Sequence, residues 1–256
     1  MELLKVGKLR KVFSKHNVVA VDEVDLSILK GEVFGLVGES GCGKSTLARA
    51  ILRLIDVQAG SVFYKGQDLL KIPCCKMRAA RKYLQIIFQD PYMSLDPRMR
   101  IGEAIEEVFV IHNNFTSSQR RSRSIEVLEM VGLGESYLRR LPSELSGGEC
   151  QRVGIARALA TDPEFIICDE PVSSLDISVQ AQILNLLMDL QKRKNLTYLF
   201  ISHDLGVVGS ICDRIAVMQH GRLVETGPCE EIFNSPQHEY TKNLLNASMI
   251  FHAPGA

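Results

Sequence analysis

The stretch GESGCGKST, from Gly38 to Thr46, carries residue types that bind phosphate. It fits the pattern G-x-x-x-x-G-K-[ST], in which glycines let successive backbone N–H groups point at phosphate oxygens. In this pattern Lys44 would neutralise the β- and γ-phosphates, and the Ser45 hydroxyl would ligate Mg²⁺. The residues that we expect to hold the nucleotide are Gly38, Ser40, Gly41, Cys42, Gly43, Lys44, Ser45 and Thr46.

A second stretch, FIICDEP, places two carboxylates at the end of an apolar run. If the run is a buried parallel strand, Asp169 and Glu170 lie at its carboxyl end, where ligands bind in open parallel sheets. Asp169 would then hold hydrated Mg²⁺, and Glu170 would polarise the water that attacks the γ-phosphate. Two acids at a strand exit are common by themselves, and it is the phosphate loop that favours the functional interpretation.

The elements around these residues follow an α/β pattern. Residues 3–12 and 18–29 are strand-rich, and the apolar run VFGLV precedes the phosphate loop, which opens a helical stretch STLARAILRLI. EFIICDE and LTYLFISHD are typical of buried parallel strands, with the helical SVQAQILNLLMDLQKRK between them. From Gln89 to Ala160 the sequence is helical, without an evident buried strand. We therefore expect a parallel sheet covered by helices, with an inserted helical lobe.

Composition narrows the classes of protein. The chain has 256 residues, enough for one large domain with a smaller lobe, and 30 basic residues balance 30 acidic ones. With this balance the chain has no net positive charge that would attract nucleic acid or an acidic membrane surface. The N-terminal residues lack a secretion signal, and no apolar run is long enough to span a bilayer. Seven scattered cysteines without a C-x-x-C pair indicate free thiols in a reducing compartment.

A third stretch, LSGGECQR, has a serine before a glycine pair, as if the chain needed a second phosphate cradle. With its continuation to SSLD at residue 176, it resembles the nucleotide-binding subunits of ABC transporters. The resemblance implies a P-loop NTPase (RecA-like) core with an N-terminal antiparallel β subdomain. It also implies a helical subdomain at about residues 90–160 and a C-terminal tail at about 228–250. In that family two subunits bind head to tail around two ATP molecules, and the signature of one caps the ATP of the other. The residues given this capping role are Ser146, Gly147 and Gly148.

Four further positions match motifs of the same family. Gln89 matches the glutamine that contacts Mg²⁺ and the attacking water and links the site to the membrane partner. Asp176 matches the aspartate that communicates between the two sites, and His203 matches the histidine that holds the γ-phosphate. Phe13 matches the aromatic platform under adenine. The resemblance thus implies catalytic roles for Lys44, Gln89, Glu170 and His203, and Mg²⁺ contacts for Ser45, Gln89 and Asp169.

Two positions depart from the family pattern. Glu149 replaces the usual glutamine of the signature, and its charge could weaken ATP capping unless the side chain points away or pairs with a cation such as Arg152. Cys42 lies within the phosphate loop, where the start of a helix can lower the pKa of a thiol. We expect a maleimide that labels Cys42 to inhibit the protein, and MgATP to protect it.

The segments FQDPYMSLDPRMRIGEAI and GPCEEIFNSPQHEYTKNLL are similar to the branch that drives uptake of peptides, nickel and metal chelates. Glu239 replaces the usual proline of the tail. Peptide import is the first expectation, and nickel or a metal chelate the second. The partners implied are a second ATPase subunit, identical or paralogous, two polytopic permease subunits and an extracytoplasmic solute-binding protein. The chain would lie peripherally on the cytoplasmic face of the inner membrane, with its permease contact in a groove beside Gln89.

Other classes stay open at this point. A soluble ATPase of the same family acting on DNA or ribosomes would share the motifs, although such chains usually carry a coiled coil or two tandem units. A phosphate-loop kinase or GTPase would leave LSGG and His203 without a role. A regulator that binds ATP without hydrolysing it is disfavoured by the presence of Glu170 and His203.

Overall fold

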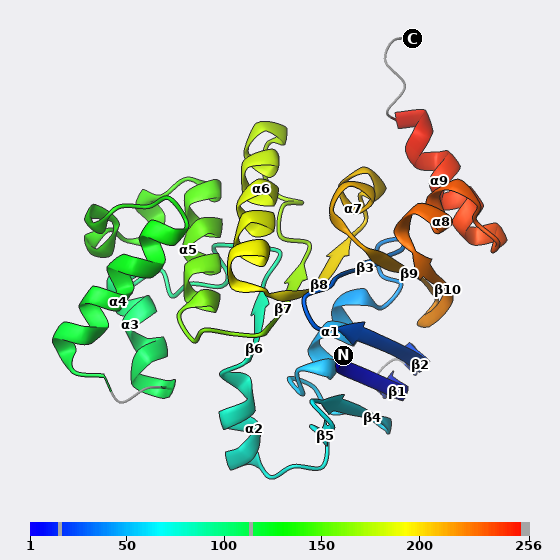
Figure 1. Ribbon diagram of the computed structural model, residues 1–256, viewed down its shortest axis with the longest axis horizontal. Coiled ribbons are helices and arrows are strands. Elements are labelled where there is room, and N and C mark those ends of the chain that lie inside the picture. Colours follow the sequence, from blue (N-terminus) through cyan, green and yellow to red (C-terminus); the bar gives the residue numbers. More distant parts are fainter. Residues whose placement is uncertain (15–16, 113–114, 252–256) are drawn as a thin grey trace. The chain divides into compact units, whose positions relative to one another are not determined.

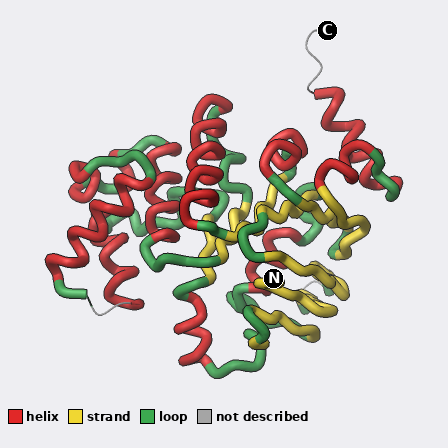
Figure 2. Tube along the Cα trace, in the orientation of Figure 1, coloured by secondary structure: helices red, strands yellow, loops and turns green. Residues whose placement is uncertain are grey.

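The computed structural model describes residues 1–14, 17–112 and 115–251, with side chains described up to residue 247. The chain forms two compact units, one made of Met1–Met77 with Thr197–Ala256 and the other of Arg78–Leu196. Figure 1 labels the elements, and Figure 2 separates helices, strands and loops by colour. No helix in the described part of the chain is long and apolar enough to cross a membrane.

The first unit begins with an antiparallel sheet of strand order β2-β1-β4-β5. Its strands are β1 (Glu2–Phe13), β2 (Val18–Leu29), β4 (Ala59–Tyr64) and β5 (Gln67–Asp68). In β1 and β2, buried residues alternate roughly with exposed ones, as expected when one face of a sheet packs on a core. The predicted N-terminal antiparallel sheet is confirmed.

The first unit also contains parallel strands. β3 (Val33–Val37) lies between β8 (Thr197–Ser202) and β9 (Arg214–Gln219) and is parallel to both, and β10 (Arg222–Pro228) is antiparallel to β9. Every residue of β3 and β8 is buried, which explains why these runs are continuously apolar. The helices of this unit are α1 (Lys44–Ile51), α7 (Leu205–Ile211), α8 (Cys229–Asn234) and α9 (Glu239–Phe251), and α2 (Cys74–Arg81) continues into the second unit.

The second unit pairs β6 (Leu84–Ile87) in parallel with β7 (Phe165–Asp169). Between these strands come α3 (Ile101–His112), α4 (Ser117–Met130), two short 3₁₀ turns (Glu135–Arg139 and Pro142–Glu144) and α5 (Gly147–Leu159). α3, α4 and α5 pack against one another (Figure 1). α6 (Ile177–Lys194) follows β7 and ends at Asn195, whose left-handed backbone is a common helix stop. Parallel strands that alternate with helices agree with the predicted α/β class.

Candidate active site

The phosphate loop connects the end of β3 at Val37 to the start of α1 at Lys44. Gly38 and Gly43 have φ values of 152° and 114°, in the region that favours glycine. A Cβ atom at Gly38 would lie 2.2 Å from the carbonyl oxygen of Met218, and one at Gly43 would lie 2.1 Å from that of Ala20. The loop therefore needs glycine at both positions, because it passes directly against backbone on either side.

Lys44 lies inside this loop, with only 4% of its surface exposed. Its Nζ donates hydrogen bonds to the carbonyl oxygens of Gly38, at 2.7 Å, and Glu39, at 2.9 Å. A buried ammonium held by carbonyls at the start of a helix favours an anion, since backbone N–H groups and the helix dipole add positive potential. These residues fit the phosphates of a nucleotide, and the Ser45 hydroxyl of the same loop is a hard oxygen donor of the kind that Mg²⁺ prefers.

The carboxyl end of β7 carries the two predicted acids. Asp169 is the last residue of the strand and is 3% exposed. Glu170 follows with a φ of 48°, a left-handed conformation that is costly for a non-glycine residue. The structure around Glu170 must hold this conformation.

Neighbours in the second unit fix Glu170. The Nε2 atom of Gln89 donates a hydrogen bond to Oε2 of Glu170 at 3.1 Å, and the hydroxyl of Ser173 donates to the Glu170 carbonyl at 3.2 Å. Ser174 donates to the carbonyl of Gln89 at 3.5 Å. The Gln89–Glu170 contact was not anticipated from the sequence, because the two residues are 81 positions apart. It places an amide directly beside the carboxylate of Glu170.

The remaining predicted residues are at element boundaries. His203 follows the last residue of β8 and is exposed, directly before Asp204, whose side chain caps α7. Asp176 is the exposed N-cap residue of α6. Phe13 ends β1 and is 41% exposed, and the ammonium of Lys11 lies 4.9 Å from the centre of its ring. This placement leaves the ring accessible for stacking.

The signature begins α5. Ser146 is the N-cap residue, and its hydroxyl accepts a hydrogen bond from the Glu149 N–H while the Glu149 carboxylate accepts one from the Ser146 N–H at 2.8 Å. This reciprocal pair is a capping box. A Cβ atom at Gly148 would lie 2.6 Å from Cγ1 of Val179 on α6, which explains the glycine there. The signature thus forms a helix N-terminus that is closed by a capping box.

Glu149 does not pair with Arg152, the cation considered from the sequence. Its carboxylate accepts a hydrogen bond from the Tyr137 hydroxyl and lies 3.9 Å from the guanidinium of Arg140. The Tyr137 hydroxyl and the Ser146 N–H lower the pKa of Glu149. Arg152 instead donates to the carbonyl of Val131 at 2.7 Å. The extra charge of the signature is therefore offset within the chain, by different residues than expected.

The pKa of the Cys42 thiol also differs from the sequence-based expectation. Burial raises the pKa of the Cys42 thiol, and the opposing charge of Lys44 does not reverse this effect. The lowered pKa expected at a helix start is therefore wrong, because burial of the thiol outweighs the favourable charge.

Known proteins are similar to this chain along most of its length. Residues 21–173 match the family described as ABC transporter. The chain is 50% identical over 250 residues to the oligopeptide transport ATP-binding protein OppF of Bacillus subtilis (strain 168). The aligned region covers 96% of this chain and 82% of OppF. The chain is also 48% identical over 247 residues to a putative peptide import ATP-binding protein of Brucella ovis. This aligned region covers 96% of this chain and 78% of that protein.

Solved structures give the same result. The post-hydrolysis dimer of the ATP-binding cassette MJ0796, bound to ADP and Pi, matches with a TM-score of 0.79 and 28% identity, covering 89% of this chain and 99% of that one. The cbiO1 protein of Clostridium perfringens matches with a TM-score of 0.81 and 25% identity, covering 98% of this chain and 99% of that one. The predicted fold class is confirmed. The chain belongs to the ABC transporter family and is one of its ATP-binding, ATP-hydrolysing subunits.

The burial of Cys42 has a measurable consequence. Because only the thiolate reacts, N-ethylmaleimide at pH 7 should label Cys42 more slowly than the exposed Cys74 and Cys75. The rate at Cys42 should rise about tenfold per pH unit below the thiol pKa, since the thiolate fraction grows with pH. Mass spectrometry of timed digests measures all three sites in one sample, and faster labelling of Cys42 than of Cys74 would contradict a raised pKa for the Cys42 thiol. Labelled protein should lose ATPase activity, and MgATP should protect it.

Glu149→Gln should change ATPase activity less than about threefold, because a glutamine keeps the capping box and removes a charge that is already offset. Glu149→Ala is the matched control. This variant loses the carboxylate of the capping box, and its free energy of unfolding should be lower by about 1 kcal/mol. The measurements are steady-state phosphate release and urea denaturation. A rise in activity above tenfold for Glu149→Gln would show that the carboxylate repels ATP.

Proposed function

We propose that this chain hydrolyses ATP to drive import of peptides through membrane permease subunits. The observation that carries the proposal is the similarity along nearly the whole chain to proteins named for oligopeptide transport and peptide import, at 50% and 48% identity. Nickel, the second cargo considered from the sequence, has no comparable support among these relatives.

The site residues have the following proposed roles. Lys44 and the N–H groups of the phosphate loop bind the phosphates, and Ser45 and Asp169 hold Mg²⁺. Glu170 polarises the attacking water, with Gln89 as its hydrogen-bond partner. His203 holds the γ-phosphate, and Phe13 stacks under adenine. The support is the arrangement within each unit: a buried lysine in a glycine loop, and a strained glutamate beside a glutamine.

The signature is proposed to act on the ATP of a second subunit, identical or paralogous. The relative MJ0796 has been solved as a dimer, which supports this arrangement. Ser146 Oγ also lies 2.9 Å from a Glu149 carboxylate oxygen, so its hydroxyl must turn from that oxygen to donate to a phosphate. Gly147, Gly148 and Asp176 are proposed to complete this contact.

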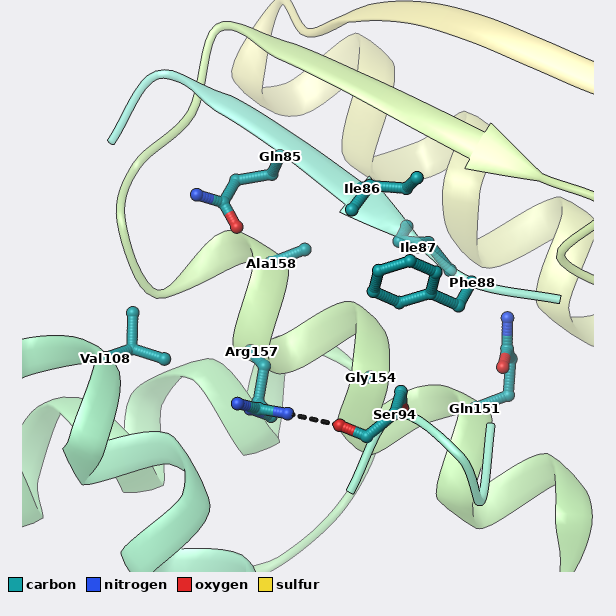
Figure 3. Close-up of a pocket in the computed structure, with 10 residues that line it drawn as sticks. All are labelled: Gln85, Ile86, Ile87, Phe88, Ser94, Val108, Gln151, Gly154, Arg157 and Ala158. Carbon is teal, nitrogen blue, oxygen red and sulfur yellow. Dashed lines mark hydrogen bonds between the residues drawn. The ribbon is translucent and has the colours of Figure 1, made fainter. Parts of the chain in front are cut away.

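The second unit offers a surface for the permease. Figure 3 shows a pocket between the strand β6 and the helices α3 and α5, lined by Phe88, the residue before Gln89. Residues 85–88 form one wall, and Gly154, Arg157 and Ala158 form another. Arg157 donates to the carbonyl of Ser94 at 2.6 Å, which fixes the loop at the rim. We propose that this groove accepts a short helix of a permease subunit, which would hold the chain peripherally at the cytoplasmic membrane face.

Gly154 allows a specific test. A Cβ atom there would meet only the Ser94 hydroxyl, at 3.8 Å, so a side chain can begin at this position and extend into the groove. Gly154→Leu should reduce co-purification with the permease and peptide uptake at least about tenfold, a loss of about 1.4 kcal/mol in binding. Gly134→Leu is the matched control, because a Cβ atom at Gly134 also has open space.

The measurements are uptake of a labelled tripeptide and of ⁶³Ni²⁺ by vesicles that contain the permease, the solute-binding protein and this chain. ATPase activity of the isolated chain should be unchanged by Gly154→Leu. Peptide uptake that is equal with and without the chain would overturn the proposed cargo. Normal uptake by Gly154→Leu would overturn the docking surface alone.

A further inference from the structure

The C-terminal helix α9 contacts the phosphate loop directly. The backbone N–H of Glu39, the second residue of the loop, donates a hydrogen bond to the hydroxyl of Tyr240 at 3.1 Å. Both residues belong to the first unit, although they are 201 positions apart. The C-terminal segment, which the sequence singled out for its similarity to one family branch, thus reaches the nucleotide loop.

The bond acts on a peptide group that also holds the lysine. The Glu39 N–H and the Gly38 carbonyl belong to the same trans peptide and point in opposite directions. The carbonyl accepts a hydrogen bond from Lys44 Nζ at 2.7 Å. Tyr240 and Lys44 therefore hold the two sides of one peptide plane at the entrance of the loop.

Tyr240 itself is held by the segment before α9. The carboxylate of Glu225 on β10 accepts hydrogen bonds from the N–H groups of Gln237, at 2.7 Å, and His238, at 3.1 Å. The imidazole Nδ1 of His238 accepts a hydrogen bond from the N–H of Tyr240 at 3.1 Å. Leu245, five residues further along α9, is 5% exposed. The helix is thus anchored at its start and along one face.

The electrostatics of this anchor suit neutral pH. Burial works to raise the pKa of Glu225, but the Gln237 N–H, the Thr241 hydroxyl and His238 together outweigh it, and the pKa is lowered. Burial raises the pKa of Tyr240. At neutral pH Glu225 is therefore ionised and the Tyr240 hydroxyl is neutral, and in these states each of them can accept the hydrogen bonds described above. The Glu225 contribution is present above the ordinary glutamate pKa and is lost as the pH falls through the lowered value.

We propose that Tyr240 is a positioning residue for ATP, through which the docked segment from Gln237 to Leu245 keeps the phosphate loop in its binding conformation. The inference rests on the proposed role of the loop as the ATP site. Without the hydroxyl the Gly38–Glu39 peptide gains alternative orientations, and nucleotide binding must order it again. The effect falls on binding, because Tyr240 contacts the start of the loop rather than the residues at the γ-phosphate.

Tyr240→Phe keeps the ring and removes only the hydroxyl. We expect the Kd for ATP to rise about three- to tenfold, the range for loss of one neutral hydrogen bond, while kcat at saturating ATP changes less than twofold. Hydrogen exchange at the Glu39 amide should accelerate. Lys242→Ala, an exposed position on the same helix, is the control and should leave Kd, kcat and exchange unchanged.

A second variant tests whether the anchoring of α9 acts on the phosphate loop through Tyr240. Glu225→Ala removes the anchor of α9 without touching the loop, and should also raise the Kd for ATP. Both changes act through the same contact. In the double variant the Kd for ATP should therefore rise by less than the product of the two single fold-changes. An unchanged Kd for Tyr240→Phe, a fall in kcat alone, or fully multiplicative effects would overturn the inference. If Lys44→Ala binds ATP normally, the proposed ATP site itself fails.

Discussion

Glu170→Gln is expected to lower the rate of ATP hydrolysis by about 100- to 10,000-fold, the usual contribution of a general base, while ATP still binds. The carboxamide cannot accept a proton from the attacking water. It can remain next to Gln89, whose Nε2 lies 3.1 Å from a carboxylate oxygen of Glu170. The expected variant is therefore a folded protein that holds ATP without cleaving it.

Phosphate release at saturating MgATP, together with titration of a fluorescent ATP analogue, measures both parts of this result. Glu129→Gln, an exposed position on α4, is the matched control for loss of a carboxylate and should retain normal activity. Hydrolysis by Glu170→Gln within fivefold of the unmodified protein would exclude Glu170 as the base. A shared loss of activity in the two variants would indicate a general effect of charge.

Lys44→Ala has the second large expected effect, a rise of at least about 30- to 100-fold in the Kd for ATP. The reason is that a charged hydrogen bond to phosphate contributes about 1.5–3 kcal/mol. The side chain is 4% exposed, and its ammonium donates to two backbone carbonyls and to the Cys42 sulfur, all within its own loop. The fold should therefore survive its removal.

Isothermal titration with MgATP, supported by a thermal melt of each variant, tests this prediction. Lys30→Ala, an exposed lysine of the same unit, should bind ATP normally. If Lys44→Ala kept the same affinity and the same melting temperature, the loop would not be the phosphate site. Reduced affinity with a collapsed melting curve would require the comparison to be repeated with Lys44→Met, which keeps the apolar part of the side chain.

The sequence predicted the parts of the fold whose signal is local. VFGLV and FIICD are buried strands, as continuous apolar runs between turn signals indicate. The glycines of the phosphate loop were predicted from spacing, and the structure adds the reason, which is backbone packed against Gly38 and Gly43. Residues at a strand end or a helix start were therefore located from the sequence before the fold was known.

Contacts between distant parts of the chain could not be predicted in this way. Nothing near Glu149 identifies Arg140 as its cation, because the pairing depends on how a 3₁₀ turn approaches α5. The burial of Cys42 is likewise a tertiary property, and it reverses the pKa shift expected from the helix start. The hydrogen bond between Glu39 and Tyr240 joins two motifs that were each recognised from the sequence but not connected.

LSGGECQR is proposed to act on the ATP of a second subunit, and the mass of Glu170→Gln in solution tests this role most directly. Static light scattering on purified protein, with and without MgATP, gives this mass, and Ser146→Arg in the same background blocks the signature. We predict a monomer without ATP, a dimer with ATP, and a monomer that still binds ATP once Ser146→Arg is added. An ATP-dependent dimer that forms equally well with Ser146→Arg would contradict the account.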